Sequence, residues 1–199
     1  EETKGRAIKG LIGYELKSPV HLPDSMVNKE DMKAAYRVLT KGDNRVHYYS
    51  HFGSDDISVI LGMVQFLLGP CGCKFLFLDH ISMVVSGIDT DDERKSLDFI
   101  STRLKMLAES YNATVVCVSH VNDEGKTRGS RNISKVADLH IYLSRDLEAL
   151  DENERNRTTV TVRKNRFGAK TGPAGRLVFD IGTFLLTPEE DVFDAGPPA

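Results

Sequence analysis

The sequence lacks several features that would place it in a specialised class of protein. No apolar run approaches the roughly 20 residues of a membrane-spanning helix, and the N-terminus has no basic segment followed by an apolar signal core. The chain has three cysteines, Cys71, Cys73 and Cys117, which are too few for a disulfide framework. These absences predict a soluble protein without membrane contacts, in a reducing cytoplasmic setting.

Neither net charge nor cysteine spacing marks a special binding site. The formal net charge is −3 over 199 residues, so the chain lacks the basic profile of a protein that coats nucleic acid, although local basic loops can still bind it. The Cys71-Gly72-Cys73 segment has no zinc-ligand spacing and no nearby histidine pair, so we expect two ordinary thiols. A hydrophobic content of 40% suits one α/β domain with a sizeable core.

The sequence also lacks a phosphate-binding loop of the pattern Gly, four residues, Gly-Lys-Ser/Thr. Gly125-Lys126-Thr127 imitates the second half of this motif, but its first glycine would fall at His120. No strand-loop-helix pattern surrounds the segment. We therefore interpret it as part of a basic loop.

Two apolar segments end in polar residues that suit a site at the edge of a sheet. Residues 74–80 read Lys-Phe-Leu-Phe-Leu-Asp-His, and residues 114–120 read Thr-Val-Val-Cys-Val-Ser-His. Both are typical of buried parallel strands, and ligands of open α/β sheets bind beyond the carboxyl ends of the strands. Asp79 and His120 are therefore predicted to face one site, where the carboxylate can hold Mg²⁺ for nucleotide hydrolysis.

Apolar spacing and capping residues predict alternating helices and strands. Helices are expected at residues 3–16, 28–41, 57–68 and 133–137, and after a capping box at residues 90–93. Strands are expected at 46–49, 74–80, 114–120 and 140–143, with antiparallel strands at 158–162, 177–179 and 184–186. Residues 82–92 and 146–157 are expected as a loop and a turn. This order predicts a mostly parallel sheet with C-terminal antiparallel hairpins.

Five blocks of residues follow one another in an order that is itself specific. They are Glu1-Glu2-Thr3 with Leu11-Ile12-Gly13; residues 77–86, Phe-Leu-Asp-His-Ile-Ser-Met-Val-Val-Ser; Asp92-Glu93-Arg94-Lys95; Arg128-Gly129-Ser130; and Lys164-Asn165-Arg166-Phe167 with Thr171-Gly172. In content and order these blocks resemble the ATPase domain of DnaB-type ring helicases. Within that family they are most similar to the phage primase-helicases related to mitochondrial Twinkle.

The resemblance implies a RecA-like P-loop NTPase core over residues 1–187, and residues 188–199 are expected to form an acidic, disordered tail. In the family, the first strand and the phosphate loop precede the segment that Glu1 matches, so the chain is expected to be a fragment that begins after them. The full-length protein would couple hydrolysis of ATP or another NTP, with Mg²⁺, to 5′ to 3′ translocation on single-stranded DNA. It would unwind duplex DNA as a homohexamer, whereas the fragment alone would be inactive.

The resemblance also implies which residues carry out hydrolysis. Glu1 matches the carboxylate that polarises the attacking water, and Asp79 matches the acid that orders Mg²⁺, usually through water. His120 matches the residue that senses the γ-phosphate and relays its presence to a DNA-binding loop. Lys164 and Arg166 lie two residues apart on a strand, so both face the same side. They match the pair that reaches a neighbouring subunit's nucleotide, with Arg166 as the arginine finger.

Further residues match positions that bind the base, the DNA or a partner. Arg145 and Phe179 match a pair that sandwiches the nucleotide base, with Phe179 in place of the usual tyrosine. Residues 82–92 and 122–131 resemble the loops that line the ring's channel, and the second supplies Lys126, Arg128, Gly129, Ser130 and Arg131 for phosphate contacts. The acidic end resembles helicase tails that dock a replicative DNA polymerase. A phage-encoded protein would work in the host cytoplasm.

Two other functions fit the same residues. A RecA-like recombinase or clamp-type ATPase would share Asp79 and the strand order, and filaments in place of closed rings would favour it. A non-catalytic DNA-binding and ring-assembly module fits the absence of the phosphate loop. A Gly-rich strand-loop-helix pattern upstream of Glu1 would support the motor, and its absence would support the module.

Overall fold

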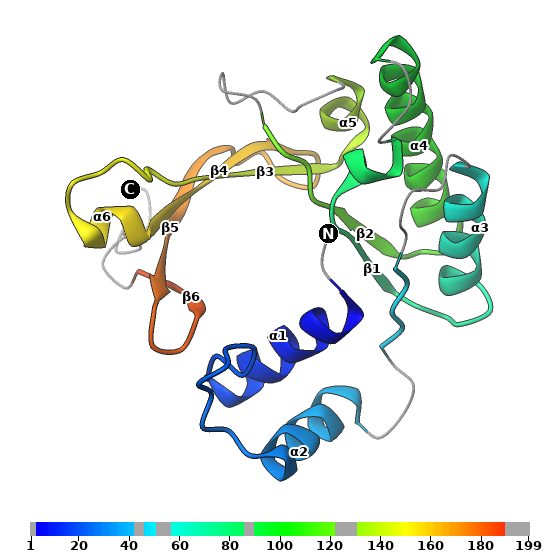
Figure 1. The fold of residues 1–199 in the computed structure, drawn as a ribbon. Helices are drawn as coiled ribbons and strands as arrows, with labels where there is room; N and C mark the ends of the chain where they lie inside the picture. Colours follow the sequence, from blue (N-terminus) through cyan, green and yellow to red (C-terminus); the bar gives the residue numbers. More distant parts are fainter. Residues whose placement is uncertain (1–2, 42–45, 51–56, 86–89, 122–130, 190–199) are drawn as a thin grey trace. The chain divides into compact units, whose positions relative to one another are not determined.

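The computed structural model describes residues 3–41, 46–50, 57–85, 90–121 and 131–189. Contacts within the chain divide it into two compact units. Unit 1 is built from residues 45–137, and unit 2 combines residues 2–44 with residues 138–199. Each unit has its own helices, strands and apolar contacts (Figure 1).

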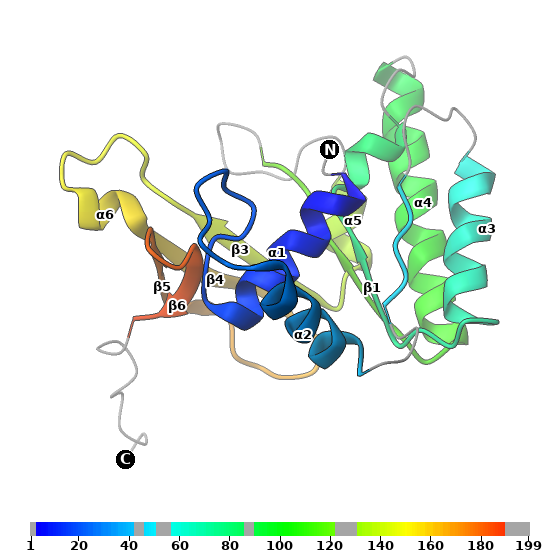
Figure 2. The same cartoon turned by 60° about the horizontal axis from the view of Figure 1, so that its bottom comes forward.

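Unit 1 packs helices against a pair of parallel strands (Figure 2). β1 (Phe75–Leu78) pairs with β2 (Thr114–Cys117). The unit also contains α3 (Ile57–Leu68), the short 3-10 helix η1 (Ile81–Val85), α4 (Thr90–Ser110) and α5 (Arg131–Val136). Its core includes the fully buried side chains of Ile81, Val85, Leu97 and Ile100.

The helices of unit 1 form where the apolar spacing predicts them. Leu97, Ile100 and Leu104 recur at helical intervals along α4 and are all buried, as expected for an amphipathic helix. α3 is apolar over most of its length and ends before Gly69-Pro70, where the Gly69 N–H donates to the Gln65 carbonyl at 2.9 Å. The core therefore follows directly from the residue pattern.

Only one face of the β1–β2 pair is covered in the described residues. Leu76 is 8% exposed, whereas Phe75 and Phe77 are 68% and 75% exposed. Alternate residues of a strand point to opposite faces, so both phenylalanines lie on the uncovered side, as does Val116 in β2 opposite Phe77. The prediction of strands buried on both faces is therefore wrong for this part of the chain.

Unit 2 begins with two helices that pack on each other. α1 (Lys4–Leu16) is capped by Thr3, whose side chain accepts a hydrogen bond from the Arg6 N–H at 3.3 Å. α2 (Lys29–Thr40) is capped by Asn28, which accepts from the Asp31 N–H at 2.8 Å. Such caps satisfy backbone donors that the helix itself leaves unpaired. A small core, Ile12, Val20 and Ala35, joins the helices and the loop between them.

The rest of unit 2 is an antiparallel sheet with strand order β3-β4-β5-β6. The strands are β3 (Leu139–Ser144), β4 (Arg157–Asn165), β5 (Gly172–Asp180) and β6 (Leu185–Pro188). A register shift interrupts the β4–β5 pairing between Val160 and Thr161. Opposite it, Gly175 has φ +120°, a conformation that a residue with a side chain adopts only under strain.

Several predicted elements differ from the observed ones. Residues 46–49 form no strand, because no described strand pairs with them. The expected loop after Asp79 contains η1, which buries Val84 and Val85, and the expected turn at residues 146–157 contains α6 (Glu152–Asn156), capped by Asp151. Antiparallel pairing also predominates among the described strands, since β1–β2 is their one parallel pair.

The remaining elements occur close to where the sequence predicts them, including the C-terminal antiparallel strands. Within the described ranges, no helix combines the length and apolar character needed to cross a membrane.

Candidate functional site

Asp79 directly follows β1, at the carboxyl end of the parallel strand pair. Backbone hydrogen bonds continue beyond the strands: the Val118 N–H donates to Leu78 at 2.9 Å, and the Ile81 N–H donates to Val118 at 3.0 Å. These bonds hold the backbone on both sides of Asp79. The Asp79 side chain is exposed, so a structured segment presents its carboxylate to solvent.

Beside Asp79 the structure brings two imidazoles together. The ring centroids of His80 and His120 are 4.5 Å apart, with an angle of 71° between the ring planes. His80 is buried, and its Nδ1 lies 2.7 Å from the Ser82 Oγ. Asp79 and His120 are predicted site residues, whereas His80 was not predicted to have a role. Its position immediately after a strand-end acid is the signal that would have identified it.

The donor set around Asp79 fits a cation that keeps much of its own hydration. Among the described residues, no group of three His, Cys, Asp or Glu side chains is arranged to hold a metal ion. Mg²⁺ is commonly bound through one or two carboxylates together with water and substrate phosphates. A single exposed carboxylate such as that of Asp79 can therefore be its protein ligand. The nearby Cys117 is no ligand candidate, because burial raises the pKa of its thiol to about 11.

In unit 2, the predicted arginine finger, Arg166, lies at the end of the sheet where β3 begins and β4 ends. Arg166 Nη1 lies 3.2 Å from Asp138 Oδ1, and the Arg166 N–H donates to the Asp138 carbonyl at 2.9 Å. Asp138 directly precedes β3, and Arg166 directly follows β4. The guanidinium therefore has a defined direction and is still 50% exposed.

Lys164, the other member of the predicted pair, lies opposite His140 in the β3–β4 ladder. Burial lowers the pKa of His140, and the positive charges of Arg163 and Lys164 lower it further. Arg163 itself lies over the Tyr142 ring at 3.7 Å from its centroid. The lowered pKa keeps His140 neutral near pH 7, which avoids a further positive charge beside Lys164.

The predicted base-binding residues Arg145 and Phe179 also lie together. The Arg145 guanidinium carbon is 5.9 Å from the centroid of the Phe179 ring. Arg145 donates to the Arg155 carbonyl and, through Nη2, to Asn156 Oδ1 at 2.9 Å. Two further rings extend this group and were not predicted: Phe184 packs edge-on against Phe179 at 5.3 Å and against His21 at 5.0 Å. These contacts join residues far apart in sequence.

Several predicted site residues lie outside the described part of the chain: Glu1, Lys126, Arg128, Gly129, Ser130 and the tail from residue 190. Arg131 is the first residue of α5, and its side chain is also outside that part. The next residue, Asn132, donates to the Asp98 carbonyl at 3.2 Å and to the Thr102 hydroxyl at 3.3 Å. The segment that follows the predicted DNA loop is thus attached to α4.

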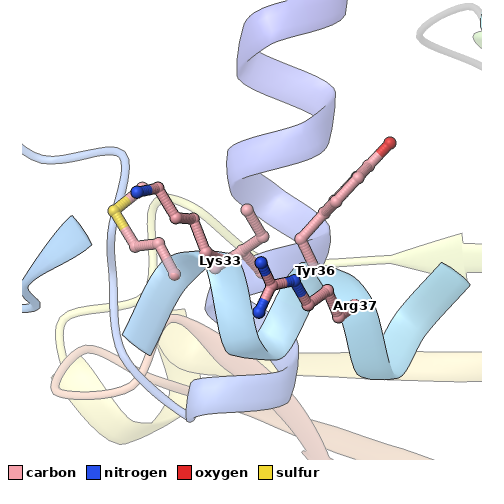
Figure 3. Close-up of a pocket in the computed structure, with 5 residues that line it drawn as sticks. Lys33, Tyr36 and Arg37 are labelled. Atoms are coloured by element: carbon pink, nitrogen blue, oxygen red, sulfur yellow. The ribbon is translucent and has the colours of Figure 1, made fainter. Parts of the chain in front are cut away.

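A hollow of about 260 Å³ lies on the α1–α2 pair, and no predicted site residue is among those that line it. Figure 3 shows Lys33, Tyr36 and Arg37 projecting from α2 around it. Ile12 and Met32 complete its lining. The hollow therefore combines an apolar floor with two cations, but it contains no acid or nucleophile.

Comparison with known proteins gives this arrangement its context. No protein-family model matches the chain. It is 31% identical over 158 residues to a DNA helicase/primase of Enterobacteria phage T3, covering 74% of this chain and 28% of that protein. It is 23% identical over 147 residues to a protein of Chlamydia psittaci described as a "Probable plasmid replicative DNA helicase", covering 68% of this chain and 32% of that protein.

The fold points in the same direction. A DnaB-like replicative helicase, solved in a study of its interactions with primase, matches with a TM-score of 0.70 and 18% sequence identity. The match covers 94% of this chain and 48% of that one. The chain thus spans less than half the length of each of these three proteins. From these sequence relatives and this fold, the chain belongs to the DnaB-type family of replicative helicase domains.

Proposed function

We propose that the chain is part of the motor of a ring-shaped replicative DNA helicase, in which NTP hydrolysis drives 5′ to 3′ translocation on single-stranded DNA. The observation that carries this proposal is the exposed Asp79 carboxylate directly after a parallel strand, with His120 in the segment that follows its partner strand β2. Helicase relatives that match across these strands support it.

The motor core of this proposal is RecA-like and is completed by a phosphate-binding segment upstream in a longer polypeptide. Two observations support an incomplete core. Phe75 and Phe77 form an uncovered apolar face on β1, and β2 is paired along only one edge in the described residues. Parallel sheets normally have both faces covered. Without the phosphate segment, the chain alone should hydrolyse no nucleotide.

Within this motor, Asp79 orders Mg²⁺ through water, and Glu1 polarises the attacking water. Bound Mg²⁺ would neutralise charge on the β- and γ-phosphates. His120 reports the presence of the γ-phosphate, and its contact with the buried His80 gives this ring a fixed neighbour. Arg145 and Phe179 hold the base between a guanidinium plane and an aromatic face, in keeping with their 5.9 Å approach.

Arg166, together with Lys164, acts on the nucleotide of a neighbouring subunit in a hexamer. Its guanidinium is half exposed and oriented by Asp138, so it can exchange a carboxylate partner for a phosphate. An arginine finger stabilises negative charge that develops in the transition state, typically by 10³-fold or more in rate. A site built in this way is complete only in the assembled ring.

Complementation between two inactive mutants tests this proposal. In a polypeptide extended upstream of Glu1, Asp79→Asn and Arg166→Ala should each lower kcat by roughly 10³-fold or more. Mixed rings should regain part of the activity, because some interfaces then combine an intact Asp79 with an intact Arg166. Steady-state phosphate release measures the recovery, and native mass spectrometry verifies mixed assembly.

Arg176→Ala is the matched control, because the Arg176 side chain is also 50% exposed and lies in the same sheet. It should leave kcat nearly unchanged. Absence of recovery in verified mixed rings, or full activity of Arg166→Ala alone, would reject the finger. Active filaments without closed rings would favour the recombinase-like alternative.

We also propose that Lys126, Arg128 and Arg131, with the backbone of Gly129 and Ser130, contact the phosphates of single-stranded DNA. Replacing the three cations with alanine should weaken binding and reduce the slope of log K against log salt by about 0.7 for each lost contact. Fluorescence anisotropy over a salt series measures both. Alanine at Lys29, Lys33 and Arg37 of α2 removes the same charge as a control. Equal slopes in the two triple mutants would show that these three cations do not contact the DNA phosphates.

The acidic residues of the tail, beginning at Glu189, are proposed to contact a polymerase. Glu189 is the last described residue, and its Oε1 accepts from Arg157 Nε at 2.7 Å. Removal of residues 190–199 should weaken polymerase association without changing hydrolysis.

A further inference from the structure

His80 is the buried polar residue closest in sequence to the proposed Mg²⁺ acid. It directly follows Asp79, is 8% exposed, and has its Nδ1 2.7 Å from the Ser82 Oγ. A buried imidazole needs polar partners to offset the loss of water. Here the hydroxyl partner belongs to η1, so the hydrogen bond joins the end of β1 to that helix.

The same imidazole supports His120. Its ring meets the His120 ring at a centroid distance of 4.5 Å and an angle of 71°, an edge-to-face arrangement that aromatic rings favour. His120 is exposed, whereas His80 is buried. An exposed side chain normally samples several rotamers, and a fixed neighbouring ring restricts them. His80 is thus placed to determine where the His120 imidazole lies.

A second connection runs from His80 into η1. The Met83 N–H donates to the His80 carbonyl at 3.1 Å, which fixes the first turn of the helix. Ile81, Val84 and Val85 of η1 are buried in the core of unit 1. A displacement of the His80 ring would therefore meet a packed helix, and close-packed cores transmit such strain.

We propose that His80 is a positioning residue that holds the His120 imidazole and couples its movement to η1. This inference rests on the proposed function, because it assigns His80 a part in signalling the nucleotide state from His120. His80 touches neither nucleotide nor Mg²⁺ in this role. It acts through His120 on one side and through Ser82 on the other.

Two substitutions separate its two contacts. His80→Phe keeps an aromatic ring beside His120 but removes the nitrogen that meets Ser82. His80→Asn keeps a short polar group that can reach Ser82 but removes the ring. His47→Ala, at an exposed histidine of the same unit, is the control. Thermal unfolding verifies that each variant is folded.

The first measurement uses the upstream-extended polypeptide with and without single-stranded DNA. His80→Asn should lower DNA-stimulated kcat by about 10-fold, which is less than the roughly 10²-fold loss that a 1 Å misplacement of a catalytic group can cause. The Kd for nucleotide should change by less than about 2-fold. His80→Phe should lower DNA-stimulated kcat less, by about 3-fold, because the ring contact with His120 remains while the hydrogen bond to Ser82 of η1 is lost. A parallel loss of kcat and nucleotide affinity, or no loss in His80→Asn, would overturn the coupling role.

The second measurement uses the chain as it is and needs no hydrolysis. In NMR spectra of the histidine side chains, His80→Asn should shift and broaden the His120 imidazole signals, whereas His80→Phe and His47→Ala should broaden them little. Unchanged His120 signals in His80→Asn would overturn the positioning role even if the motor is active. If the extended Asp79→Asn variant hydrolyses nucleotide normally, the proposed function fails, and the NMR result still decides whether His80 holds His120.

Discussion

Asp79 in unit 1 and Arg166 in unit 2 are both charged and exposed, but their surroundings differ. In the described residues, the Asp79 carboxylate makes no hydrogen bond or ion pair, whereas Arg166 is paired with Asp138 at 3.2 Å. Arg145 is likewise held by Asn156 and lies against Phe179. An unpaired carboxylate can bind a hydrated cation without first losing another partner. A paired guanidinium is already oriented and needs only to exchange its partner.

The two units also differ in how their strands are covered. Helices cover one face of β1–β2 in unit 1, around the fully buried Leu97 and Ile100. In unit 2, Leu139, Ile141 and Leu143 leave an exposed apolar row along β3. Burial of apolar area is the main source of stability, so the covered core of unit 1 should tolerate fewer substitutions.

The largest expected contrast comes from two aliphatic truncations in the isolated chain. Ile100→Ala removes a fully buried side chain and should lower the free energy of unfolding by about 2–5 kcal/mol. Leu143→Ala removes a side chain that is 54% exposed and should cost about 0.5 kcal/mol or less. Urea unfolding followed by circular dichroism measures both. Equal losses would mean that the apolar row on β3 is covered in solution.

A smaller effect is expected at the Arg166 partner. Asp138→Asn keeps the size of the side chain but removes its charge, so Arg166 should lose part of its orientation. Exposed ion pairs contribute about 1 kcal/mol or less, which corresponds to a fall in kcat of about 2- to 5-fold in the upstream-extended ring. Asp146→Asn, an exposed acid of unit 2, is the control. A loss as large as that of Arg166→Ala would give Asp138 a more direct role.

The smallest expected effect concerns His140. The pKa of His140 is lowered in the folded state, whereas in the unfolded chain it should lie in the ordinary histidine range, about 6.5. Near and below this pH the unfolded chain therefore binds a proton more readily than the folded chain does. Stability should therefore fall as pH drops through and below that range. His140→Gln should remove this part of the pH dependence, measured as urea midpoints at pH 7.5 and 5. An unchanged dependence would place the responsible group elsewhere.

Local patterns predict much of this fold and part of its site. The Asn28 cap, the α4 stripe and the parallel pair with polar ends can all be identified over a few residues. Contacts between distant segments cannot. Asp138 and Arg166 are 28 residues apart, and His21 reaches Phe184 across most of the chain. The strand expected at residues 46–49 fails for the same reason, because a strand needs a partner that its own residues do not specify.

Burial is the other property that local pattern predicts poorly. Phe75 and Phe77 have the composition of a buried strand, yet both are exposed, because whether a face is covered depends on segments elsewhere. The roles of Asp79, His120, Lys164 and Arg166 remain predictions until the mutants are measured. The structure adds His80 and Asp138 to the residues that need testing.

The uncovered face of β1 also affects the solubility of the isolated chain. Two exposed phenylalanines and neighbouring valines on a short strand pair, with an unpaired edge in the described residues, form a surface that promotes self-association. The isolated chain should aggregate increasingly with concentration and with salts that strengthen apolar contacts. Light scattering of Phe75→Ser and Phe77→Ser variants would show how far these side chains limit its solubility.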